Sequence, residues 1–528
     1  MTKEAARLEF HAMTDFPSLQ QALGIPRAFQ QLTYIYQYLL HLQVKTVIVE
    51  PRYFDRDYLS EFSAFYSLSA KGYHNYCRRA HFFVNTVTRD VFMDAAGGSQ
   101  EAIIKMRGAY KGFTVIRPID SAPFGRTVLS WYPDDYKDKN PRVTKPSRDY
   151  VCNLSGIKLT VYGLAWQQQD QGVSACATIG LWTMLHSSAF NERYAIPTTV
   201  AITQAANNLS WGLRTFPSRH LFLQQVCEAI KGFGLSPYLV EGDQFPNAPG
   251  MPKTFSKEKL CNTIASLVRS AFPCVIGGSV VRPGSTTPVG HINVCVGFRS
   301  QPTLGPSPMY ADGDLMAMYI HDDNIGPAVR FTIGHYDSKL MQRSTNPTHP
   351  ICLAPDNPPQ GQNVAATNYG FFIPTFILAA VENDLRTSAE ALIQRAIDVR
   401  YRIATLALPD ADKHSLPQPT LIVGTQYATV ADYIGGMLHD RLRTQPKVLA
   451  ATRLQLQEEV GPMSLYVGVV RVADSTGALI DVLFDTTDSD INHPIFATVC
   501  YVGPYAGYVG IWEKLEPGVF GGKVILAY

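Results

Sequence analysis

Cys176 lies where a loop is expected to give way to a helix. Residues 169–175 include a glycine and several polar side chains, and residues 176–186 show the apolar spacing of a helix. Unpaired backbone N–H groups and the helix dipole favour a thiolate at such a position. The same N–H groups can stabilise an oxyanion, with the side chain of Gln169 or Gln171 as a second donor. A cysteine buried in a core at a helix start is the alternative interpretation.

A histidine and two acids at expected strand ends could complete a site around this cysteine. His291 directly precedes the apolar alternation of residues 292–298, so we expect it at the mouth of a strand, within reach of a helix terminus. Asp322 follows the strand expected at residues 316–321, and its carboxylate could accept the second imidazole N–H and so fix the tautomer. Asp323 is the alternative orienting residue, and both acids could instead cap a turn.

The three segments together resemble the papain-like cysteine peptidases. The closest pattern is that of the bacteriocin-processing (double-glycine leader) peptidases and their cytoplasmic relatives. That family has a Gln shortly before a helix-starting Cys, a Gly-His that begins a strand, and an Asp or Asn that closes the next strand. The order of Cys176, His291 and Asp322 is the same, and the resemblance covers residues 157–327. It implies that Cys176 is the nucleophile, His291 its base and Asp322 the residue that orients the base.

The chain departs from the family pattern at the position of the oxyanion-stabilising Gln. The family Gln usually lies six residues before the Cys, and this chain has Asp170 there. Gln171 is one residue nearer to Cys176 and Gln169 one residue farther away. The choice between them stays open at the level of the sequence, with a weak preference for Gln169.

The resemblance implies a cytoplasmic bacterial thiol protease that cleaves a peptide or isopeptide bond in a protein or peptide substrate through a thioester on Cys176. It implies no cofactor and no metal ion. A transglutaminase-like acyltransferase or a deamidase would pass through the same thioester, and these remain alternatives. A non-catalytic scaffold with a decayed papain-like site is a further alternative, for which the shifted Gln is the best argument.

Composition limits the possible partners. The 528 residues carry a net charge of +2, are 46% hydrophobic and include no long basic run, so we expect no nucleic-acid partner. No apolar stretch reaches the length of a membrane span and the N-terminus lacks a signal-like apolar region, so we expect a cytoplasmic protein without membrane contact. The nine cysteines are scattered, odd in number and never spaced as CxxC, which argues against disulfides and structural zinc. The oligomeric state is left open.

The order of the expected helices and strands predicts an α+β protein of three domains. Residues 1–147 are expected to form an N-terminal α/β or α+β domain that ends in a polar linker. Residues 148–364 are expected to form the papain-like catalytic domain, with helices packed on an antiparallel sheet. Residues 365–528 are expected to form a C-terminal α/β domain with a long helix at residues 387–406 and a hairpin at residues 464–484.

Overall fold

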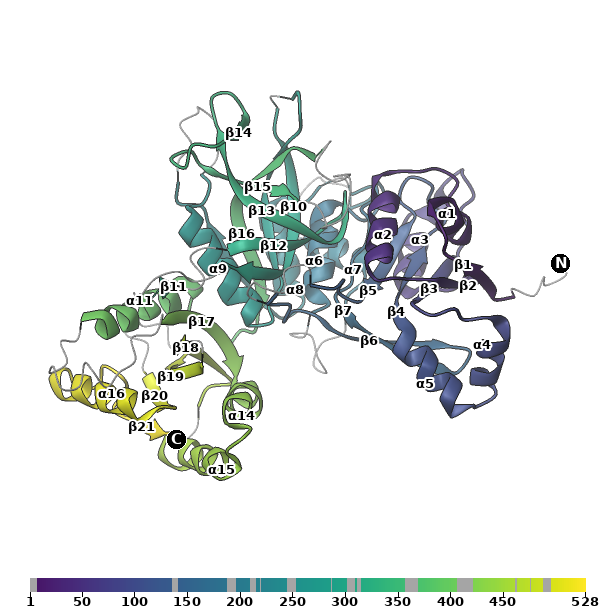
Figure 1. Ribbon diagram of the computed structural model, residues 1–528. Coiled ribbons are helices and arrows are strands. Elements are labelled where there is room, and N and C mark those ends of the chain that lie inside the picture. Colours follow the sequence, from purple (N-terminus) through teal and green to yellow (C-terminus); the bar gives the residue numbers. More distant parts are fainter. Residues whose placement is uncertain are drawn as a thin grey trace.

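The structure of the chain is a computed structural model in which three units, each built on a sheet, follow one another (Figure 1). The N-terminal unit lies at the right of the view, the central unit at the top and the C-terminal unit at the lower left. The structure describes residues 7–134, 141–187, 196–208, 215–218, 220–244, 253–285, 287–301, 309–310, 315–356, 369–405, 421–460, 463–474, 476–487 and 495–528.

The N-terminal unit is a five-stranded antiparallel sheet whose strands lie side by side in chain order. The strands are β1 (Glu9–Ala12), β2 (Thr46–Tyr53), β3 (Cys77–Phe83), β4 (Tyr110–Ile116) and β5 (Phe124–Leu129). Helices in the connections cover the sheet: α1 (Phe16–Leu23), α2 (Gln30–His41), α3 (Arg56–Ala64), η1 (Tyr66–Leu68), α4 (Arg89–Ala96) and α5 (Gln100–Ala109). Every strand pair is antiparallel, so this unit belongs to the α+β class.

The hairpin of β6 (Arg148–Leu154) and β7 (Ile157–Gly163) differs from its expected place in the central domain. Strand β7 packs against β4, β5 and α5 of the N-terminal unit. Just after it, Trp166 forms an isolated antiparallel bridge with Thr127. Alternation in β7 buries every second side chain, and the buried face needs the N-terminal sheet as its partner. The N-terminal unit therefore extends to about residue 166, beyond the boundary expected at residue 147.

The central unit is an antiparallel barrel with helices packed on it. Six strands close a ring in the order β12 (Leu315–Asp322), β10 (Val289–Ser300), β9 (Cys274–Val281), β16 (Phe371–Val381), β15 (Ile351–Pro355) and β13 (Gly326–Asp337), which pairs again with β12. Two outer strands, β8 (Ser236–Glu241) and β14 (Gln342–Ser344), pair with β16 and β13. The helices are α6 (Cys176–Leu185), α7 (Thr199–Ala206), α8 (Leu223–Gly232) and α9 (Lys257–Arg269). The expected α+β class with antiparallel strands is confirmed, and the sheet closes on itself.

Helix α6 is the central helix of this unit, and its sequence explains why. Its residues from Ala177 to Leu185 are all buried, so the helix is apolar on every side and needs cover on every side. It packs against β9 and β10 on one side and against α7 and α8 on another. A Cβ on Gly180 would lie only 2.8 Å from Cγ2 of Ile292, so the glycine lets α6 approach β10 closely.

The C-terminal unit is a six-stranded sheet in the order β11 (Met309–Tyr310), β17 (Ile422–Thr429), β18 (Tyr466–Asp474), β19 (Gly477–Asp485), β20 (Ile495–Cys500) and β21 (Val524–Leu526). The terminal pairs β11–β17 and β20–β21 are parallel, and the others are antiparallel. Its helical segments are α11 (Ala389–Thr405), α13 (Val430–Asp432), η3 (Tyr433–Met437), α14 (Leu438–Leu442), α15 (Pro446–Gln455), η4 (Leu456–Val460) and α16 (Gly503–Leu515).

Two strands lie outside the units in which the sequence places them. Strand β16 lies after the expected boundary at residue 364, but it pairs with β8, β9 and β15 in the barrel. Strand β11 comes from the connection between β10 and β12 of the barrel, yet it pairs with β17. Both differences arise because the local sequence pattern of a strand does not determine which strand it pairs with. The central unit therefore extends to about residue 381, beyond the boundary expected at residue 364.

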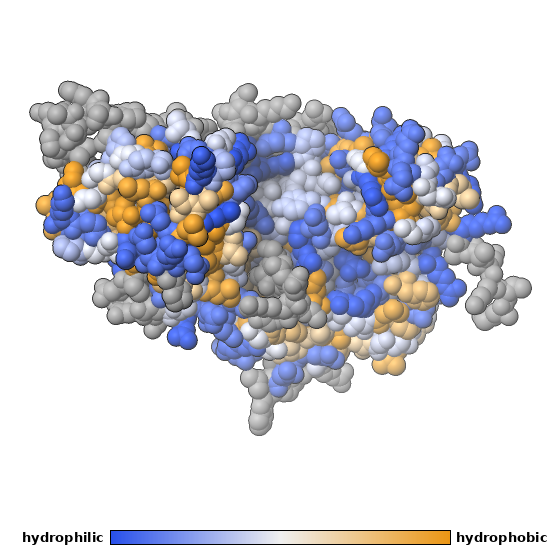
Figure 2. Space-filling model, turned by 90° about the horizontal axis from the view of Figure 1, so that it is seen from below, coloured by the Kyte–Doolittle hydropathy of each residue, from blue (hydrophilic) through white to orange (hydrophobic). Residues whose placement is uncertain are grey.

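Hydrophilic and hydrophobic side chains are intermixed on the face of the molecule shown in Figure 2, with hydrophobic areas over both the C-terminal unit at the left and the N-terminal unit at the right. Within the described ranges, no helix combines the length and the apolar character that crossing a membrane requires.

Candidate functional site

Cys176 is the first residue of α6, directly after the N-cap residue Ala175. Ala175 has an extended backbone and its side chain cannot cap the helix, so the first backbone N–H groups of α6 have no side-chain partner from the cap. All nine cysteines are free thiols, and only Cys176 and Cys227 are partly exposed. Burial raises the pKa of the Cys227 thiol, which disfavours the thiolate there. Cys176 thus combines exposure with a helix N-terminus, and both properties favour a reactive thiol.

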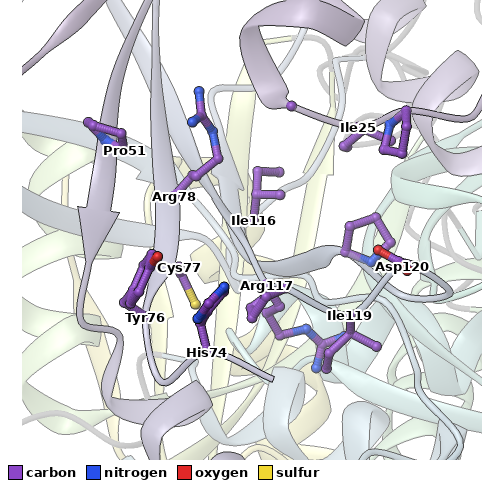
Figure 3. A pocket seen from close by; sticks show the side chains of 14 residues that line it. Ile25, Pro51, His74, Tyr76, Cys77, Arg78, Ile116, Arg117, Ile119 and Asp120 are labelled. Atoms are coloured by element: carbon purple, nitrogen blue, oxygen red, sulfur yellow. The ribbon is translucent and has the colours of Figure 1, made fainter. Parts of the chain in front are cut away.

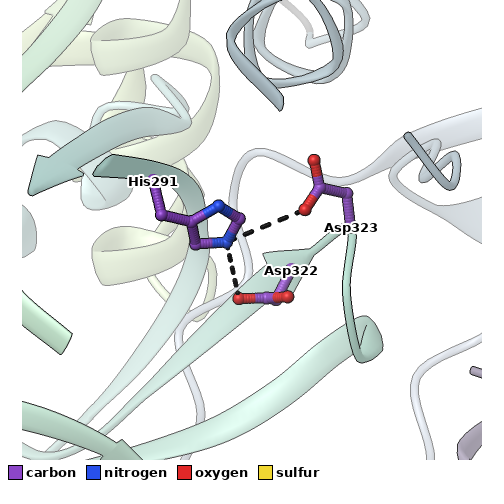
Figure 4. A group of neighbouring side chains, drawn as sticks. All are labelled: His291, Asp322 and Asp323. Carbon is purple, nitrogen blue, oxygen red and sulfur yellow. Dashed lines mark hydrogen bonds and ion pairs between the residues drawn. The ribbon is translucent and has the colours of Figure 1, made fainter. Parts of the chain in front are cut away.

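His291 joins Cys176 to a carboxylate from the next strand of the barrel. It lies near the start of β10, close enough to Cys176 for an interaction between the two side chains to raise the pKa of His291. On the other side of the ring, Nε2 donates to Oδ2 of Asp322 over 3.1 Å (Figure 4). Since Asp322 engages Nε2, Nδ1 is the ring nitrogen left for the thiol. Thiol, imidazole and carboxylate are therefore neighbours in that order, an arrangement that suits a nucleophile, its base and an orienting group.

The surroundings of His291 favour its charged form. Burial of the ring disfavours the charge, but the charge of Asp322 and the hydrogen bond to it hold the pKa of His291 well above its ordinary value. The interaction with Cys176 raises the pKa of His291 further, and so does the charge of Asp323. An imidazolium beside a thiol stabilises the thiolate form.

Asp323 is a second carboxylate near the same imidazole nitrogen. Its Oδ1 lies 3.7 Å from Nε2 of His291, farther than the 3.1 Å of Asp322, and accepts a hydrogen bond from Asn324 over 3.0 Å. Its Oδ2 is buried and has no hydrogen-bond partner among the described residues. Burial and the charge of Asp322 raise the pKa of Asp323 to about 7, although His291 opposes the shift. The shorter distance and the hydrogen bond favour Asp322 as the residue that orients His291.

Asp322 is itself held in place from several sides. Its Oδ1 accepts the backbone N–H groups of Asn324 and Ile325 over 2.8 and 3.1 Å. Its Oδ2 accepts the hydroxyl of Tyr369 over 2.9 Å, and Asn293 donates to that hydroxyl over 3.2 Å. A carboxylate with all these donors has little rotational freedom, so it can fix the orientation of the imidazole.

His291, Asp322 and Asp323 also offer donor atoms that all lie within 4.8 Å of one another, a set that could in principle hold a divalent cation. Both oxygens of Asp322 already accept hydrogen bonds, and the Nε2–H of His291 points at one of them. A cation would have to displace that imidazole hydrogen bond. The arrangement therefore fits an oriented base better than a metal centre.

The loop before Cys176 is held by a buried ionic network that reaches into the N-terminal unit. Oδ1 of Asp170 accepts the backbone N–H groups of residues 172–174 over 2.8, 2.8 and 3.2 Å. Its Oδ2 pairs with Arg117 over 3.1 Å, and the same guanidinium nitrogen donates to Glu61 of α3 over 2.9 Å. Glu61 also accepts the hydroxyl of Ser174 over 2.9 Å. Asp170 therefore shapes the loop, which accounts for an acid at the position where the family pattern has Gln.

The two glutamines near Asp170 have different surroundings. Gln169 is partly buried, donates to Oδ1 of Asn324 over 2.9 Å, and lines a cavity of about 620 Å³ together with Cys176 and His291. Gln171 is exposed and lines the neighbouring cavity of about 540 Å³ but not the larger one. Gln169 is thus nearer to the thiol and the base. The other residues that line the larger cavity are Gln30, Gln31, His220, Val280, Arg282, Pro283, Val289, Gly290, Asn324 and Tyr369.

A separate cavity of about 330 Å³ in the N-terminal unit also holds a cysteine and a histidine, Cys77 and His74 (Figure 3). Cys77 lies in a strand and is buried, and burial and the charge of Asp55 raise the pKa of its thiol. No hydrogen bond joins Cys77 to His74, both of which are described residues. This pair lacks a helix N-terminus and an oriented base, so we do not regard it as a second nucleophile site.

Comparison with known protein families and with curated proteins finds no match for this chain.

Several contributors to the site are not apparent in the sequence. Gln31 of α2 lines the larger cavity and donates to the backbone carbonyl of Asp323 over 3.3 Å. Tyr369 and Asn293 support Asp322, and Asn324 links Gln169 to the neighbourhood of His291, with Nδ2 at 3.4 Å from Nε2. Asn324 follows the two acids in the same turn and Asn293 lies two positions after His291 on β10, so both lie within segments that the sequence points to. Gln31 and Tyr369 come from distant segments whose local patterns are those of an ordinary helix and loop.

Proposed function

We propose that the chain is a papain-like cysteine hydrolase that cleaves a peptide or isopeptide bond through a thioester on Cys176. The observation that carries the proposal is the chain of contacts from the Cys176 thiol to His291 and from His291 to Asp322. Cys176 lines a cavity of about 620 Å³, through which a carbonyl substrate can reach the thiol. The fold supports the proposal by analogy, because a helix that starts with the cysteine packs on an antiparallel barrel whose adjacent strands carry the base and the acid.

The proposed reaction begins with the thiolate of Cys176 and the imidazolium of His291. The sulfur attacks the carbonyl carbon, and the resulting oxyanion is stabilised by backbone N–H groups at the start of α6 and by the amide of Gln169. His291 donates its proton to the leaving amine as the C–N bond breaks, which leaves a thioester. Neutral His291 then takes a proton from water, the hydroxide attacks the thioester, and the acid leaves as the C–S bond breaks. Asp322 keeps the imidazole in the orientation that both proton transfers need.

Selective alkylation tests whether Cys176 is the reactive thiol. Iodoacetamide at pH 6, with peptide mapping by mass spectrometry, is expected to modify Cys176 first among the nine cysteines. His291→Ala is expected to slow this modification, because it removes the imidazolium that stabilises the thiolate. Faster labelling of Cys227 or of any buried cysteine, with Cys176 inert in the folded protein, would show that the assignment of the nucleophile is wrong.

The proposal also requires that Cys176 and His291 act as one unit. On a peptide library, Cys176→Ala, His291→Ala and the double variant are expected to lose turnover to about the same extent. Losses that multiply in the double variant would mean that the two residues do not share a mechanism. Mass spectrometry of the products distinguishes the fates of the thioester: a cleaved backbone supports the hydrolase, a cross-link the acyltransferase, and conversion of Gln to Glu the deamidase.

The amide that completes the oxyanion site can be identified by comparing Gln169→Ala with Gln171→Ala. Removal of an oxyanion donor lowers turnover by about 100-fold to 1,000-fold, because the bond strengthens as negative charge develops on oxygen. We expect this loss for Gln169→Ala and little change for the exposed Gln171. Full turnover in both variants would mean that backbone N–H groups alone, or another side chain, stabilise the oxyanion.

A further inference from the structure

The charges that line the larger cavity are unbalanced. Among the described residues, its lining contains Arg282, His220 and His291, but no Asp or Glu side chain. The charge on His291 is compensated by Asp322 directly behind it. Arg282 is exposed and, within the part of the chain that the structure describes, pairs with no carboxylate. Arg282 therefore leaves an uncompensated positive charge in the wall of the cavity that holds the thiol.

The chain segments that carry these cavity residues contain no acidic residue that could neutralise the charge of Arg282. Residues 278–291, which carry Arg282 and His291, contain no Asp or Glu. Residues 209–227, which carry His220, contain none either. A guanidinium keeps its charge throughout the physiological pH range, so the positive character of this wall does not depend on the protonation of His220.

The neighbouring cavity on the other side of Gln169 has a different character. Its lining is mainly amide and hydroxyl side chains, including Gln31, Gln168 and Asn324. The one acid among its described lining residues, Asp170, is buried and paired with Arg117. This side can exchange hydrogen bonds with a neutral polar group but offers no free charge. The two cavities therefore differ, and among their described lining residues only Arg282, in the larger cavity, offers an unpaired cation to an anion.

We propose that the cavity selects acyl substrates that carry a carboxylate beside the scissile bond, and that Arg282 recognises that carboxylate. The proposal rests on the proposed function, because it concerns the substrate of the thiol of Cys176. A guanidinium can donate two parallel hydrogen bonds to a carboxylate, which neither His220 nor the amides of the other cavity can match. The carboxylate could belong to an Asp or Glu side chain or to a chain terminus, and Arg282 would bind either in the same way.

Two alkylating reagents of equal size test the charge at the thiol. Iodoacetate and iodoacetamide both form an S–CH₂ bond and release iodide, but only iodoacetate carries a carboxylate. We divide the rate of Cys176 alkylation by iodoacetate by the rate with iodoacetamide. This ratio is expected to fall about threefold to tenfold in Arg282→Gln and further in Arg282→Glu. In the wild-type protein, the same ratio is expected to fall with added salt. Arg443→Gln, which removes an equally exposed charge from the C-terminal unit, is the control and should leave the ratio unchanged.

The outcomes separate the two proposals. If neither reagent labels Cys176 in the wild-type protein, the proposed function fails and this inference fails with it. If Cys176 is labelled but the ratio is the same in Arg282→Gln, the inference alone is overturned. Arg282 is exposed, so its substitution should leave the unfolding midpoint unchanged, and an unchanged midpoint excludes misfolding as the cause of a lower ratio.

Matched peptides distinguish the two sources of the carboxylate. For internal Glu and Gln peptides of otherwise identical sequence, kcat/KM is expected to favour Glu by about tenfold, and Arg282→Gln should remove the preference. If the preference instead appears between a free and an amidated C-terminus, the chain terminus is the recognised group. If neither comparison shows a difference that depends on Arg282, the inference is wrong.

Discussion

The chemistry of His291 depends on two carboxylates that differ by 0.6 Å in their distance from its Nε2. Asp322 lies at 3.1 Å and accepts a hydrogen bond, and Asp323 lies at 3.7 Å. Both charges raise the pKa of His291, and burial of the ring opposes them. The two carboxylates therefore affect pH dependence in ways that separate variants can distinguish.

Asp322→Asn is expected to move the high-pH limb of kcat/KM to lower pH. Without the charge of Asp322, burial has more influence, and the pKa of His291 falls from its raised value. The proton that the leaving group needs is then lost at a lower pH, and we expect a shift of about 1–3 pH units. The pH profile of peptide turnover measures it. Asp120→Asn, at an exposed loop position, is the control, and an unmoved limb in Asp322→Asn would assign the orienting role elsewhere.

Asp323→Asn is expected to stabilise the folded protein more at pH 8 than at pH 5. The pKa of Asp323 is raised from 3.8 to about 7, so the folded state binds this proton more tightly than the unfolded state does. The stability that this proton contributes is complete below about pH 3.8 and is lost as the pH rises through 7. The Asn variant has no such loss. Its free energy of unfolding, relative to that of the wild type, should therefore rise between pH 5 and pH 8 by roughly 1 kcal/mol or more.

Urea unfolding of wild type and Asp323→Asn at the two pH values measures this difference. Asp323 and His291 titrate as a pair, so the measured inflection belongs to both groups. If the difference in free energy of unfolding between the variant and the wild type is the same at pH 5 and pH 8, the raised pKa of Asp323 is contradicted.

Among the secondary-structure elements, α6, β10 and the loop before α6 decide where the thiol lies. Cys176 and Gly180 are four residues apart and so share one face of α6. That face meets β10 beside His291, since Gly180 approaches Ile292. The loop is fixed from the other side by Arg117, which follows β4, and by Glu61 of α3. The first turn of α6 is thus positioned between the barrel and the N-terminal unit.

Glu61→Gln is expected to lower both stability and the reactivity of Cys176. Glu61 is fully buried and accepts hydrogen bonds from Arg117, Ser174, Thr199 and Gln167, so its loss leaves the Arg117 charge with Asp170 alone. Breaking a buried ion pair typically costs about 3–5 kcal/mol. Urea unfolding and the rate of Cys176 alkylation measure the two effects. The matched control is Glu101→Gln on the exposed side of α5, and equal behaviour of the two variants would show that the network does not hold the loop.

The three units of the molecule share elements, and the site lies where two of them meet. Gln31 of the N-terminal unit reaches the backbone of Asp323 in the barrel. Tyr34 of the same helix donates to the carbonyl of Pro327 over 3.0 Å, and Trp166 donates to the carbonyl of Asp322 over 2.9 Å. The N-terminal unit is therefore part of the frame around the orienting acid.

Truncation distinguishes the boundary observed at the end of β16 from the one expected at residue 364. A variant that ends at residue 364 lacks β16, which leaves backbone groups of β8, β9 and β15 unpaired, so it should not fold. A variant that ends at residue 383 keeps the barrel and should keep selective labelling of Cys176, at reduced stability because α9 loses its contacts with α11 and β17. Circular dichroism and peptide mapping of the labelled proteins compare the two, and selective labelling of the shorter variant would contradict a role for β16 in the barrel.

The local setting of each candidate residue follows from the amino-acid pattern around it. Cys176 starts a helix, His291 lies near the start of a strand and Asp322 ends a strand, as the pattern of apolar residues predicted. The α+β class with antiparallel strands also followed from the order of these patterns. Such features depend on neighbours within a few positions along the chain, which is the range that periodicity and turn residues report.

Which groups meet in the site depends on the packing of the whole chain. No local pattern indicates that Tyr369 supports Asp322, that Arg117 and Glu61 hold the loop before Cys176, or that Gln31 lines the cavity. No local pattern indicates that β16 closes the barrel. Nor does one indicate that Gln169, and not Gln171, shares a cavity with the thiol. These contacts join segments far apart in the chain, and they form because buried charges and strand edges need partners wherever the fold brings them.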